Sequence, residues 1–386
     1  MYRLGGFMRK YFFLILLLVA GQGLPSVAQV AIETTAREAI LMDAETGAVL
    51  FEKNADTLMH PASMSKLMTV AMAFDRLAEG SLKMEDTFPV SESAWRIQGS
   101  KMFVELGSRI SVHDLLRGII VQSGNDACVV VAEGIGGDEQ NFARLMTERA
   151  RQIGMTHSEF RNASGWPDPE HMMTARDLAT LARYLVTTHK QYYPIFKEID
   201  FTWHGIKQGN RNPLLYSYPG ADGLKTGHTE EAGYGLTGSA ERNGRRLIVV
   251  VTGLASDKAR GIEAERLLTL GFNEFGTYTL LSEGQKLEDA DVWLGAVDKI
   301  PLVAAKNIRV TLPRSARKSL KAKLVYQTPL AAPVTAGTQV GTVTFTADGM
   351  QPVTVPVAAG ASADRLGFFG KIPAAVNYLL WGASSG

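Results

Sequence analysis

Hydrophobic and polar positions follow two different patterns along this chain. Up to about residue 275, segments with apolar residues three and four positions apart, which is typical of helices, are mixed with short strand-like runs. Beyond Gly276, apolar and polar residues alternate one by one, and Pro and Gly are frequent. The patterns predict a large domain of helices and antiparallel sheet, followed by a small β-rich domain.

Several segments have a clear secondary-structure signature. Apolar runs flank both residues 44–47 ("AETG") and Asn243-Gly244, so each pair of runs predicts a β-hairpin. Helical spacing begins at Ser63, and Thr174 is a suitable N-cap for the helix that follows it. Further helical patterns cover residues 111–135, 139–153, 174–188 and 259–275.

The N-terminus resembles a targeting segment. Arg3, Arg9 and Lys10 precede an apolar run over residues 11–20, and small residues follow up to Ala28. This order predicts a secretory signal peptide over residues 1–28, cleaved after Ala28. About ten apolar residues fall short of the roughly 20 that a membrane-spanning helix needs. The mature protein is therefore expected to be exported.

The C-terminal segment 361–386 differs from the β-rich region before it. Apolar residues recur there at helical spacing: Phe369, Ile372, Val376, Leu379 and Leu380. The spacing predicts an amphipathic helix that lies on a membrane surface. Packing of the segment on its own domain stays open, because Pro373 interrupts the helix and only Arg365 and Lys371 are cationic.

Composition excludes several functional classes. The formal net charge of the 386-residue chain is +1, so broad electrostatic binding of nucleic acid is not expected. The single cysteine, Cys128, allows no internal disulfide and is expected to be a small buried hydrophobic residue. The seven histidines are scattered without metal-ligand spacing, so neither a metal nor another cofactor is expected.

Three short motifs carry candidate chemistry. Ser63 and Lys66 are three residues apart, so their side chains share one face of a helix. Ser123-Gly124-Asn125 follows about sixty residues later, and residues 225–229 read "KTGHT". Each motif alone is a weak signal. The ordered set S-x-x-K, S-x-N and K-T-G is typical of penicillin-binding proteins and serine β-lactamases.

With these motifs, the chain resembles low-molecular-mass penicillin-binding proteins of the D-alanyl-D-alanine carboxypeptidase type. The resemblance extends from about Glu38 to the C-terminus and includes residues 171–185, "HMMTARDLATLARYL". It implies an α/β (α+β) serine β-lactamase/transpeptidase-like domain over residues 29–275, with an antiparallel sheet and helices. A small all-β domain over residues 276–360 and the amphipathic tail would follow.

Acyl transfer gives the motif residues physical roles. Ser63 becomes an effective nucleophile only when a base removes its proton, and Lys66 can do so only as a neutral amine. Burial and a second cation, Lys225, would both disfavour the charged form of Lys66. The hydroxyl of Ser123 both donates and accepts, so it can relay the proton to the leaving amine.

Other residues are candidates for substrate binding. Asn125 is suited to orienting Lys66 and a substrate amide, and Gly227 lets an edge strand approach the substrate closely. Lys225 can attract the terminal carboxylate of the substrate, to which Thr226 and Thr229 can donate hydrogen bonds.

The resemblance adds two further features. It implies an oxyanion hole formed by the backbone N–H groups of Ser63 and His228. It also implies that Arg260 assists recognition of the carboxylate.

The predicted function is removal of the terminal D-alanine from peptidoglycan stem pentapeptides through an acyl-enzyme on Ser63. β-Lactams would be covalent inhibitors at the same serine. The resemblance places such a protein in the periplasm, peripheral on the outer face of the cytoplasmic membrane. A homodimer stays open.

Three alternatives remain at this stage. A class A β-lactamase needs an E-x-x-L-N segment, whereas the comparable loop holds only Asp168 and Glu170, and Gly124 stands where those enzymes have aspartate. An endopeptidase that cuts D-alanyl cross-links would use the same site. A catalytically inactive peptidoglycan-binding protein is the third alternative.

The chain departs from the family pattern at two places near the motifs. Ser65 stands where threonine is commoner. Residues 163–166, "ASGW", differ from the usual small-Gly-Leu pattern, so the shape of this loop is not predicted. His171, in the same loop, is expected to fix the loop rather than to perform catalysis.

Overall fold

The computed structural model describes residues 33–367. The predicted signal peptide and the apolar part of the predicted tail lie outside the described residues. Within residues 33–367, none of the helices combines the length and the apolar character needed to cross a bilayer.

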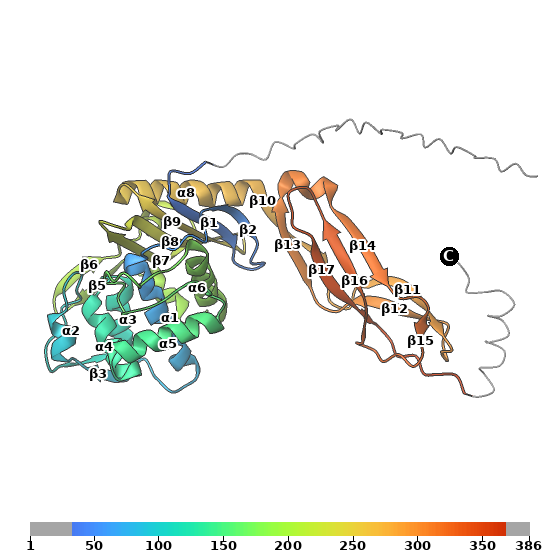
Figure 1. Ribbon diagram of the computed structural model, residues 1–386, viewed down its shortest axis with the longest axis horizontal. Helices are drawn as coiled ribbons and strands as arrows, with labels where there is room; N and C mark the ends of the chain where they lie inside the picture. The colour runs from blue at the N-terminus through green and yellow to red at the C-terminus, as the bar shows by residue number, and fades with distance from the viewer. Residues whose placement is uncertain (1–32, 368–386) are drawn as a thin grey trace, which may run out of the picture. The chain divides into compact units, whose positions relative to one another are not determined.

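The larger part of the described chain is built around a five-stranded antiparallel sheet with the order β2-β1-β9-β8-β7 (Figure 1). Its strands are β1 (Glu38–Asp43), β2 (Val49–Lys53), β7 (Ala221–Thr229), β8 (Gly233–Arg242) and β9 (Arg245–Leu254). Both predicted hairpins are confirmed as β1–β2 and β8–β9. Asn243 and Gly244 have φ of 52° and 73°, as a tight hairpin turn requires. The K-T-G motif lies on β7, the edge strand.

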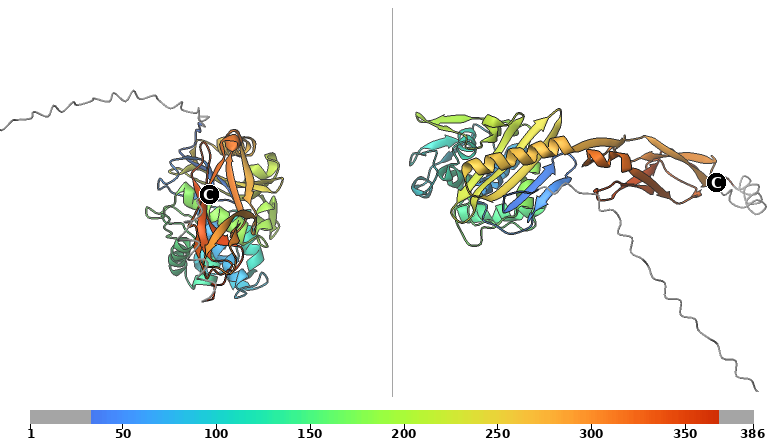
Figure 2. Two further views of the ribbon diagram at one scale, coloured as in Figure 1. Left: turned by 90° about the vertical axis from the view of Figure 1, so that its right-hand side faces the viewer. Right: turned by 90° about the horizontal axis from the view of Figure 1, so that it is seen from above.

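Helices cover both faces of this sheet. The long helix α8 (Asp257–Glu274) lies across one face, and the helix bundle lies on the other (Figure 2). The bundle helices are α1 (Lys66–Ala78), α2 (Glu92–Arg96), α3 (Val112–Ile120), α4 (Asn125–Gly136), α5 (Glu139–Gln152) and α6 (Ala175–Thr188). The shorter elements are η1 (Ala62–Ser65), η2 (Tyr193–Lys197), α7 (Leu214–Ser217), β3 (Thr87–Pro89), β4 (Arg109–Ser111), β5 (Asp200–Trp203) and β6 (Ile206–Gly209).

Most helix predictions agree with the structure, and one needs correction. Thr174 caps α6 as predicted, because its hydroxyl accepts a hydrogen bond from the Asp177 backbone N–H at 3.0 Å. The helical segment 111–135 is divided into α3 and α4. The break has a local cause, since Ser123 adopts a left-handed φ of 60° that a helix does not allow.

The helix that carries the first motif is the centre of the hydrophobic core. Every residue of α1 from Lys66 to Phe74 is buried, and Leu67 and Met68 have no exposed surface. A helix enclosed on all sides cannot shift without opening cavities in a close-packed interior. Its first turn is therefore held in a fixed position relative to the sheet.

The β-rich region begins at Phe275, directly after α8. Its six-stranded sheet has the order β14-β16-β17-β12-β11-β15, and β10 pairs with β13. The strands are β10 (Phe275–Leu281), β11 (Lys286–Trp293), β12 (Lys299–Ala304), β13 (Ile308–Pro313), β14 (Lys321–Tyr326), β15 (Leu330–Ala331), β16 (Gln339–Thr346) and β17 (Val353–Ala359), with the short helix η3 (Arg314–Ser319). These strands enclose their own hydrophobic core, so the predicted fold class is confirmed.

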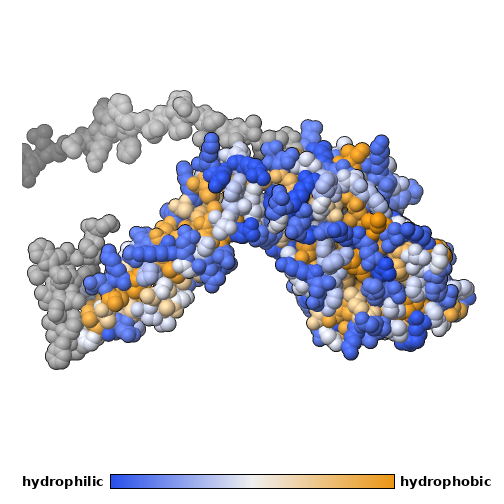
Figure 3. Space-filling model, turned by 180° about the vertical axis from the view of Figure 1, so that it is seen from behind, coloured by the Kyte–Doolittle hydropathy of each residue, from blue (hydrophilic) through white to orange (hydrophobic). Residues whose placement is uncertain are grey.

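On the face shown in Figure 3, hydrophilic and hydrophobic side chains are interspersed.

Candidate active site

The structure brings Ser63 and Lys66 into direct contact. Ser63 lies on η1, the single 3₁₀ turn that leads into α1, and Lys66 is the first residue of α1. The Lys66 Nζ atom donates a hydrogen bond to Ser63 Oγ at 2.8 Å. Lys66 is fully buried, whereas Ser63 is partly accessible. The pair therefore combines an accessible hydroxyl group with an amine that is excluded from water.

Burial changes the acid–base behaviour of Lys66. Removal of the ammonium group from water lowers the pKa of Lys66 to about 8, and the positive charge of Arg211 acts in the same direction. Sequence reasoning assigned the second cation to Lys225 and missed Arg211. The pKa of Lys225 is also held well below its usual value, first by burial and then by the charge of Lys66.

The loop before α6 lies against the start of α1. The Ser164 carbonyl accepts a hydrogen bond from Lys66 Nζ at 2.6 Å, and the Ala163 carbonyl accepts one from Thr69 Oγ1 at 2.6 Å. His171, which is buried, lies 2.7 Å from Ser65 Oγ through its Nε2 atom. The "ASGW" segment, whose shape could not be predicted, therefore provides a backbone acceptor for the candidate base.

Ser123 and Asn125 lie at the break between α3 and α4. Ser123 is 1% exposed, and within residues 33–367 its hydroxyl has no hydrogen-bond partner. A buried polar group without a partner is rare in proteins, so this hydroxyl is a candidate for a functional role. The Asn125 Nδ2 atom donates to the Gln98 carbonyl at 2.7 Å. The hydrogen bonds found for Lys66 Nζ in the described region go to Ser63 and Ser164, so the expected contact between Asn125 and Lys66 is replaced by the Ser164 carbonyl.

Asp126 has a supporting role that sequence reasoning missed. Its carboxylate accepts hydrogen bonds from the backbone N–H groups of Met102, Phe103 and Val104 at 2.9, 2.8 and 3.1 Å. Because Asp126 follows Asn125 directly, this contact fixes residues 102–104 beside the second motif. Its position next to the S-x-N motif is a signal that could have identified it.

The edge strand β7 lies directly against η1. A Cβ atom added to Gly227 would be 2.8 Å from the Pro61 carbonyl oxygen and 3.2 Å from Ala62 Cβ. Only glycine permits this approach. Lys225 and Thr226 are 3% and 4% exposed on the same strand. The first and third motifs therefore lie side by side.

Arg260 reaches β7 from α8. Its Nη1 atom donates to the carbonyl oxygens of Gly227 at 3.2 Å and Gly235 at 3.4 Å. The guanidinium is largely buried and also pairs with Asp257. The resemblance implies that Arg260 assists carboxylate recognition, and the structure places its guanidinium against the Gly227 carbonyl of the K-T-G strand.

His228 and Thr229 end the same strand. The His228 ring is exposed and stacks on Tyr234 with ring centroids 3.9 Å apart. In the described part of the chain no carboxylate contacts this ring, so a Ser-His-Asp arrangement has no support. The Thr229 hydroxyl oxygen accepts a hydrogen bond from the Ala232 backbone N–H at 3.0 Å, which leaves its O–H free to donate.

Cys128, as expected, is a buried residue of α4, and burial raises the pKa of its thiol to about 12. It is therefore inert as a nucleophile at neutral pH. The histidine, cysteine and carboxylate groups within residues 33–367 form no cluster suited to a metal ion.

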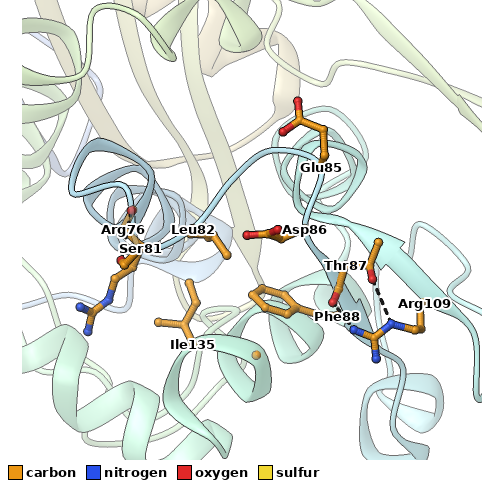
Figure 4. A pocket seen from close by; sticks show the side chains of 10 residues that line it. Arg76, Ser81, Leu82, Glu85, Asp86, Thr87, Phe88, Arg109 and Ile135 are labelled. Carbon is orange, nitrogen blue, oxygen red and sulfur yellow. Dashed lines mark hydrogen bonds between the residues drawn. The ribbon is translucent and has the colours of Figure 1, made fainter.

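A separate surface hollow lies away from the motifs, between the end of α1 and the paired strands β3 and β4 (Figure 4). Leu82, Phe88 and Ile135 provide its apolar lining. Arg109 lies at one side of the hollow and donates to the Thr87 backbone and hydroxyl oxygens. None of the three motifs contributes to its lining, so the hollow is not part of the candidate active site.

Fold and site together define a class of enzymes. A serine on a 3₁₀ turn contacts the first lysine of a buried helix, and an edge strand with K-T-G lies against that turn. The same ordered motifs are typical of penicillin-recognising serine enzymes. A family model described as D-alanyl-D-alanine carboxypeptidase matches residues 25–256, and one described as penicillin-binding protein 5, C-terminal domain, matches residues 275–365. The chain belongs to the D-alanyl-D-alanine carboxypeptidase family.

Relatives and solved structures agree with this assignment. D-alanyl-D-alanine carboxypeptidase DacC of Escherichia coli (strain K12) is 39% identical over 345 residues, which cover 87% of this chain and 86% of the relative. Penicillin binding protein 5 from Haemophilus influenzae superimposes with a TM-score of 0.80 at 35% identity and covers 86% of this chain and 99% of its own. Penicillin-Binding Protein D2 from Listeria monocytogenes, solved in an ampicillin-bound form, superimposes with a TM-score of 0.58 at 31% identity and covers 64% of this chain and 100% of its own.

Proposed function

We propose that this protein is a serine-type D-Ala-D-Ala carboxypeptidase that removes the terminal D-alanine of peptidoglycan stem pentapeptides and is acylated by penicillins at Ser63. One observation carries the proposal. A buried lysine with a pKa of about 8 donates to the hydroxyl of a partly accessible serine at 2.8 Å. At pH 7 about a tenth of such lysines is uncharged, so the amine can accept the serine proton.

Acyl transfer on Ser63 requires a base, an oxyanion hole and a proton relay. Neutral Lys66 takes the proton of Ser63 as Ser63 Oγ bonds to the carbonyl carbon of the scissile amide. The carbonyl oxygen becomes negative and is stabilised by the backbone N–H groups of Ser63 and His228. The proton passes through Ser123, whose buried hydroxyl has no partner in the described chain, to the leaving nitrogen. The C–N bond breaks, D-alanine leaves, and water hydrolyses the ester on Ser63.

Cationic residues select the free carboxylate of the leaving D-alanine. Arg260 supplies positive charge at β7, and a carboxylate beside Lys225 would favour the charged form of that buried amine. Thr226 and Thr229 supply hydroxyl donors. Asn125 orients the amide on the other side of the scissile bond. A β-lactam presents the same carboxylate and a strained amide, so it acylates Ser63 in the same way.

The rival functions differ in deacylation and in substrate shape. Rapid β-lactam hydrolysis needs a glutamate that activates water near the acyl-enzyme. Glu170 is exposed and pairs with Arg161 at 3.2 Å, on the outside of the loop. This geometry supports a slow-deacylating penicillin-binding protein over a β-lactamase.

The location of the protein is part of the same proposal. Residues 1–28 act as a signal peptide for export to the periplasm, and residues 361–386 attach the protein to the outer face of the cytoplasmic membrane. Residues 29–275 form the catalytic domain, and residues 276–360 form the β domain that precedes the tail. A homodimer remains an open alternative.

Product analysis tests this function. Purified protein is incubated with a D-Ala-D-Ala pentapeptide and, separately, with a D-alanyl cross-linked muropeptide, and the products are identified by mass. We expect loss of one alanine from the pentapeptide in the wild-type protein and no loss in the Ser63→Ala variant. Cleavage of the cross-linked substrate alone would indicate an endopeptidase, and absence of both products with intact penicillin binding would indicate an inactive binding protein.

A further inference from the structure

A cationic segment, residues 314–323 ("RSARKSLKAK"), covers η3 and the start of β14 in the β domain. It contains five exposed cations and no carboxylate: Arg314, Arg317, Lys318, Lys321 and Lys323. The ion pairs found in the described part of the β domain involve Lys286, Lys299 and Arg309 and none of these five cations. The neighbouring β16–β17 turn contributes one carboxylate, Asp348, whose backbone N–H donates to a serine of the segment at 2.9 Å. The segment therefore keeps a strong positive charge.

Two arginines hold this segment beside the end of α8. Arg314 Nε donates to the Asn273 carbonyl of α8 at 2.9 Å, and the Arg317 guanidinium lies 4.9 Å from the centre of the Tyr278 ring. Arg260, near the other end of α8, contacts the K-T-G strand. Because a helix rises 1.5 Å per residue, Asn273 lies about 20 Å along α8 from Arg260. A polymer bound at the active site can therefore also reach the cationic segment.

The lysines of β14 lie on the outer face of the sheet. Lys321 pairs with Thr346 and Lys323 with Thr344 on β16, whereas Phe345 between these threonines is buried in the core. Since side chains alternate along a strand, the two lysines and the two threonines share the face that is turned away from the core. β14 is also the edge strand of this sheet (Figure 1). The edge thus presents ammonium groups next to hydroxyl groups, which suits a partner that carries carboxylates and sugar hydroxyls.

The register places this cationic end far from the point where the chain leaves the β domain. Phe345, next to the partner of Lys321, pairs with Val353, the first residue of β17. β17 then extends to Ala359 over about 20 Å, at about 3.3 Å per residue. The segment 361–386, proposed above to attach to the membrane, follows that far end. The position of the lysines therefore favours the substrate polymer over the membrane surface as their partner.

We propose that residues 314–323 and the outer face of β14 bind peptidoglycan through the carboxylates of its stem peptides. The inference rests on the proposed function and adds a second contact with the same polymer, away from Ser63. Each stem peptide that is not cross-linked ends in a carboxylate, and stem peptides repeat along the glycan, so the polymer complements the charge of the segment. A second weak contact on one polymer raises the effective concentration of stem peptides at the active site.

Cosedimentation with purified sacculi tests this contact. The full-length protein carries Ser63→Ala, so that cleavage does not alter the sacculi, and is compared with the same protein carrying Lys318→Gln, Lys321→Gln and Lys323→Gln. The triple substitution should weaken binding about three- to tenfold, because exposed charges each contribute little. Binding without the triple substitution should also fall as salt is raised. Unchanged binding after the triple substitution would overturn the proposal.

A matched control removes the same charge elsewhere in the β domain. Lys286→Gln, Lys299→Gln and Lys306→Gln together affect three exposed lysines outside the cationic segment. This control should bind sacculi like the protein without it, and a loss as large as that of the triple substitution would contradict the proposal, because net charge alone would then explain binding.

Chemical modification of the polymer tests the partner without a variant. Sacculi whose carboxylates have been amidated should bind the protein about as weakly as untreated sacculi bind the triple variant, and unchanged binding would overturn the proposal. Vesicles that contain phosphatidylglycerol test the membrane as the partner. Loss of vesicle binding in the triple variant, with sacculus binding intact, would assign the lysines to the membrane and also overturn it.

The proposed function is tested separately, by release of D-alanine from a soluble D-Ala-D-Ala pentapeptide by the wild-type protein. If no D-alanine is released, the proposed function itself fails. If D-alanine is released but the triple substitution does not weaken binding to sacculi, only the contact at residues 314–323 fails.

Discussion

The Nε2 atom of His171 lies 2.7 Å from Ser65 Oγ, and both side chains are buried. The other ring nitrogen of His171 accepts from the Arg161 backbone N–H at 3.3 Å, so Nε2 carries the proton and donates to the serine. Burial lowers the pKa of His171 to about 4, which keeps the ring neutral at physiological pH. This hydrogen bond joins the loop before α6 to Ser65, which lies directly before Lys66 in the sequence.

The first prediction concerns the hydrogen bond between Ser65 and His171. Ser65→Ala and His171→Asn should each lower the free energy of unfolding by about 1–3 kcal/mol, because each leaves a buried polar group without its partner. The double variant should lose less than the sum of the two, since only one contact is removed. Denaturant unfolding measures these values. Strict additivity would show that the two side chains do not interact.

Ser65→Thr is the conservative control for the pair. Threonine keeps the hydroxyl, so stability and acylation rate should stay close to those of the wild-type protein. Ser65→Ala should reduce kcat more than it changes KM, because the loop then presents the Ser164 carbonyl to Lys66 less accurately. A change confined to KM would argue against a positioning role.

The second prediction is the pH dependence of acylation. Because burial lowers the pKa of Lys66 to about 8, the neutral fraction of this amine rises as the pH increases through 8. The rate constant for benzylpenicillin acylation should rise about tenfold per pH unit below 8 and level off above it. A rate that is flat from pH 6 to 9 would contradict the assignment of Lys66 as the base.

Arg211 provides a control for which the direction of the shift in the pH profile is defined. Its positive charge lowers the pKa of Lys66, so Arg211→Gln should move the rising limb of the profile to higher pH. Arg211 also donates to Ser100 Oγ at 2.7 Å, so the position of the limb, rather than the absolute rate, is the relevant readout. A shift to lower pH would exclude this electrostatic role.

The third prediction concerns the hydrogen bonds that hold α1 in position. The partly buried carboxylate of Asp75 on α1 accepts hydrogen bonds from Arg149 at 2.8 Å, from His189 at 2.9 Å and from Tyr184. Burial alone would raise the pKa of Asp75, but these contacts outweigh it and hold the pKa below its usual value. Asp75→Asn should lower the free energy of unfolding at pH 7 by about 3 kcal/mol.

The pH dependence of this effect has a definite sign. A lowered carboxyl pKa stabilises the folded state above the unfolded pKa of about 4, and the contribution is lost as the pH falls through the folded pKa. The difference between wild type and Asp75→Asn should therefore shrink below about pH 4. Glu79→Gln is the control, since the exposed pair Arg76–Glu79 should contribute less than about 1 kcal/mol. Equal losses in the two variants would contradict this role of Asp75.

The sequence predicted the parts of the fold that depend on local signals. The Asn243-Gly244 turn, the Thr174 cap and the alternating strands after Gly276 each follow from neighbouring residues, and the structure confirms them. The division of residues 111–135 into two helices could not be predicted from apolar spacing. It depends on the left-handed conformation of Ser123, which a serine adopts only when its surroundings impose it.

The candidate site was predictable only where a motif marked it. Ser63, Lys66 and Lys225 are recognised from spacing, whereas Ser164 and Arg211 act through contacts between segments far apart in the sequence. Ser164 contributes a backbone carbonyl, for which any residue type would serve, so its identity carries no signal. Arg211 affects Lys66 through its charge, and nothing in its neighbourhood in the sequence indicates that proximity.

The most direct measurement of the central claim is the intact mass of the protein after brief exposure to benzylpenicillin. If neutral Lys66 activates Ser63, the wild-type mass increases by that of one penicillin molecule, and peptide mapping places the adduct on Ser63. The Ser63→Ala variant should show no increase, and Lys66→Ala should acylate at least a thousandfold more slowly. A stable adduct in Ser63→Ala, or wild-type acylation rates in Lys66→Ala, would contradict the account.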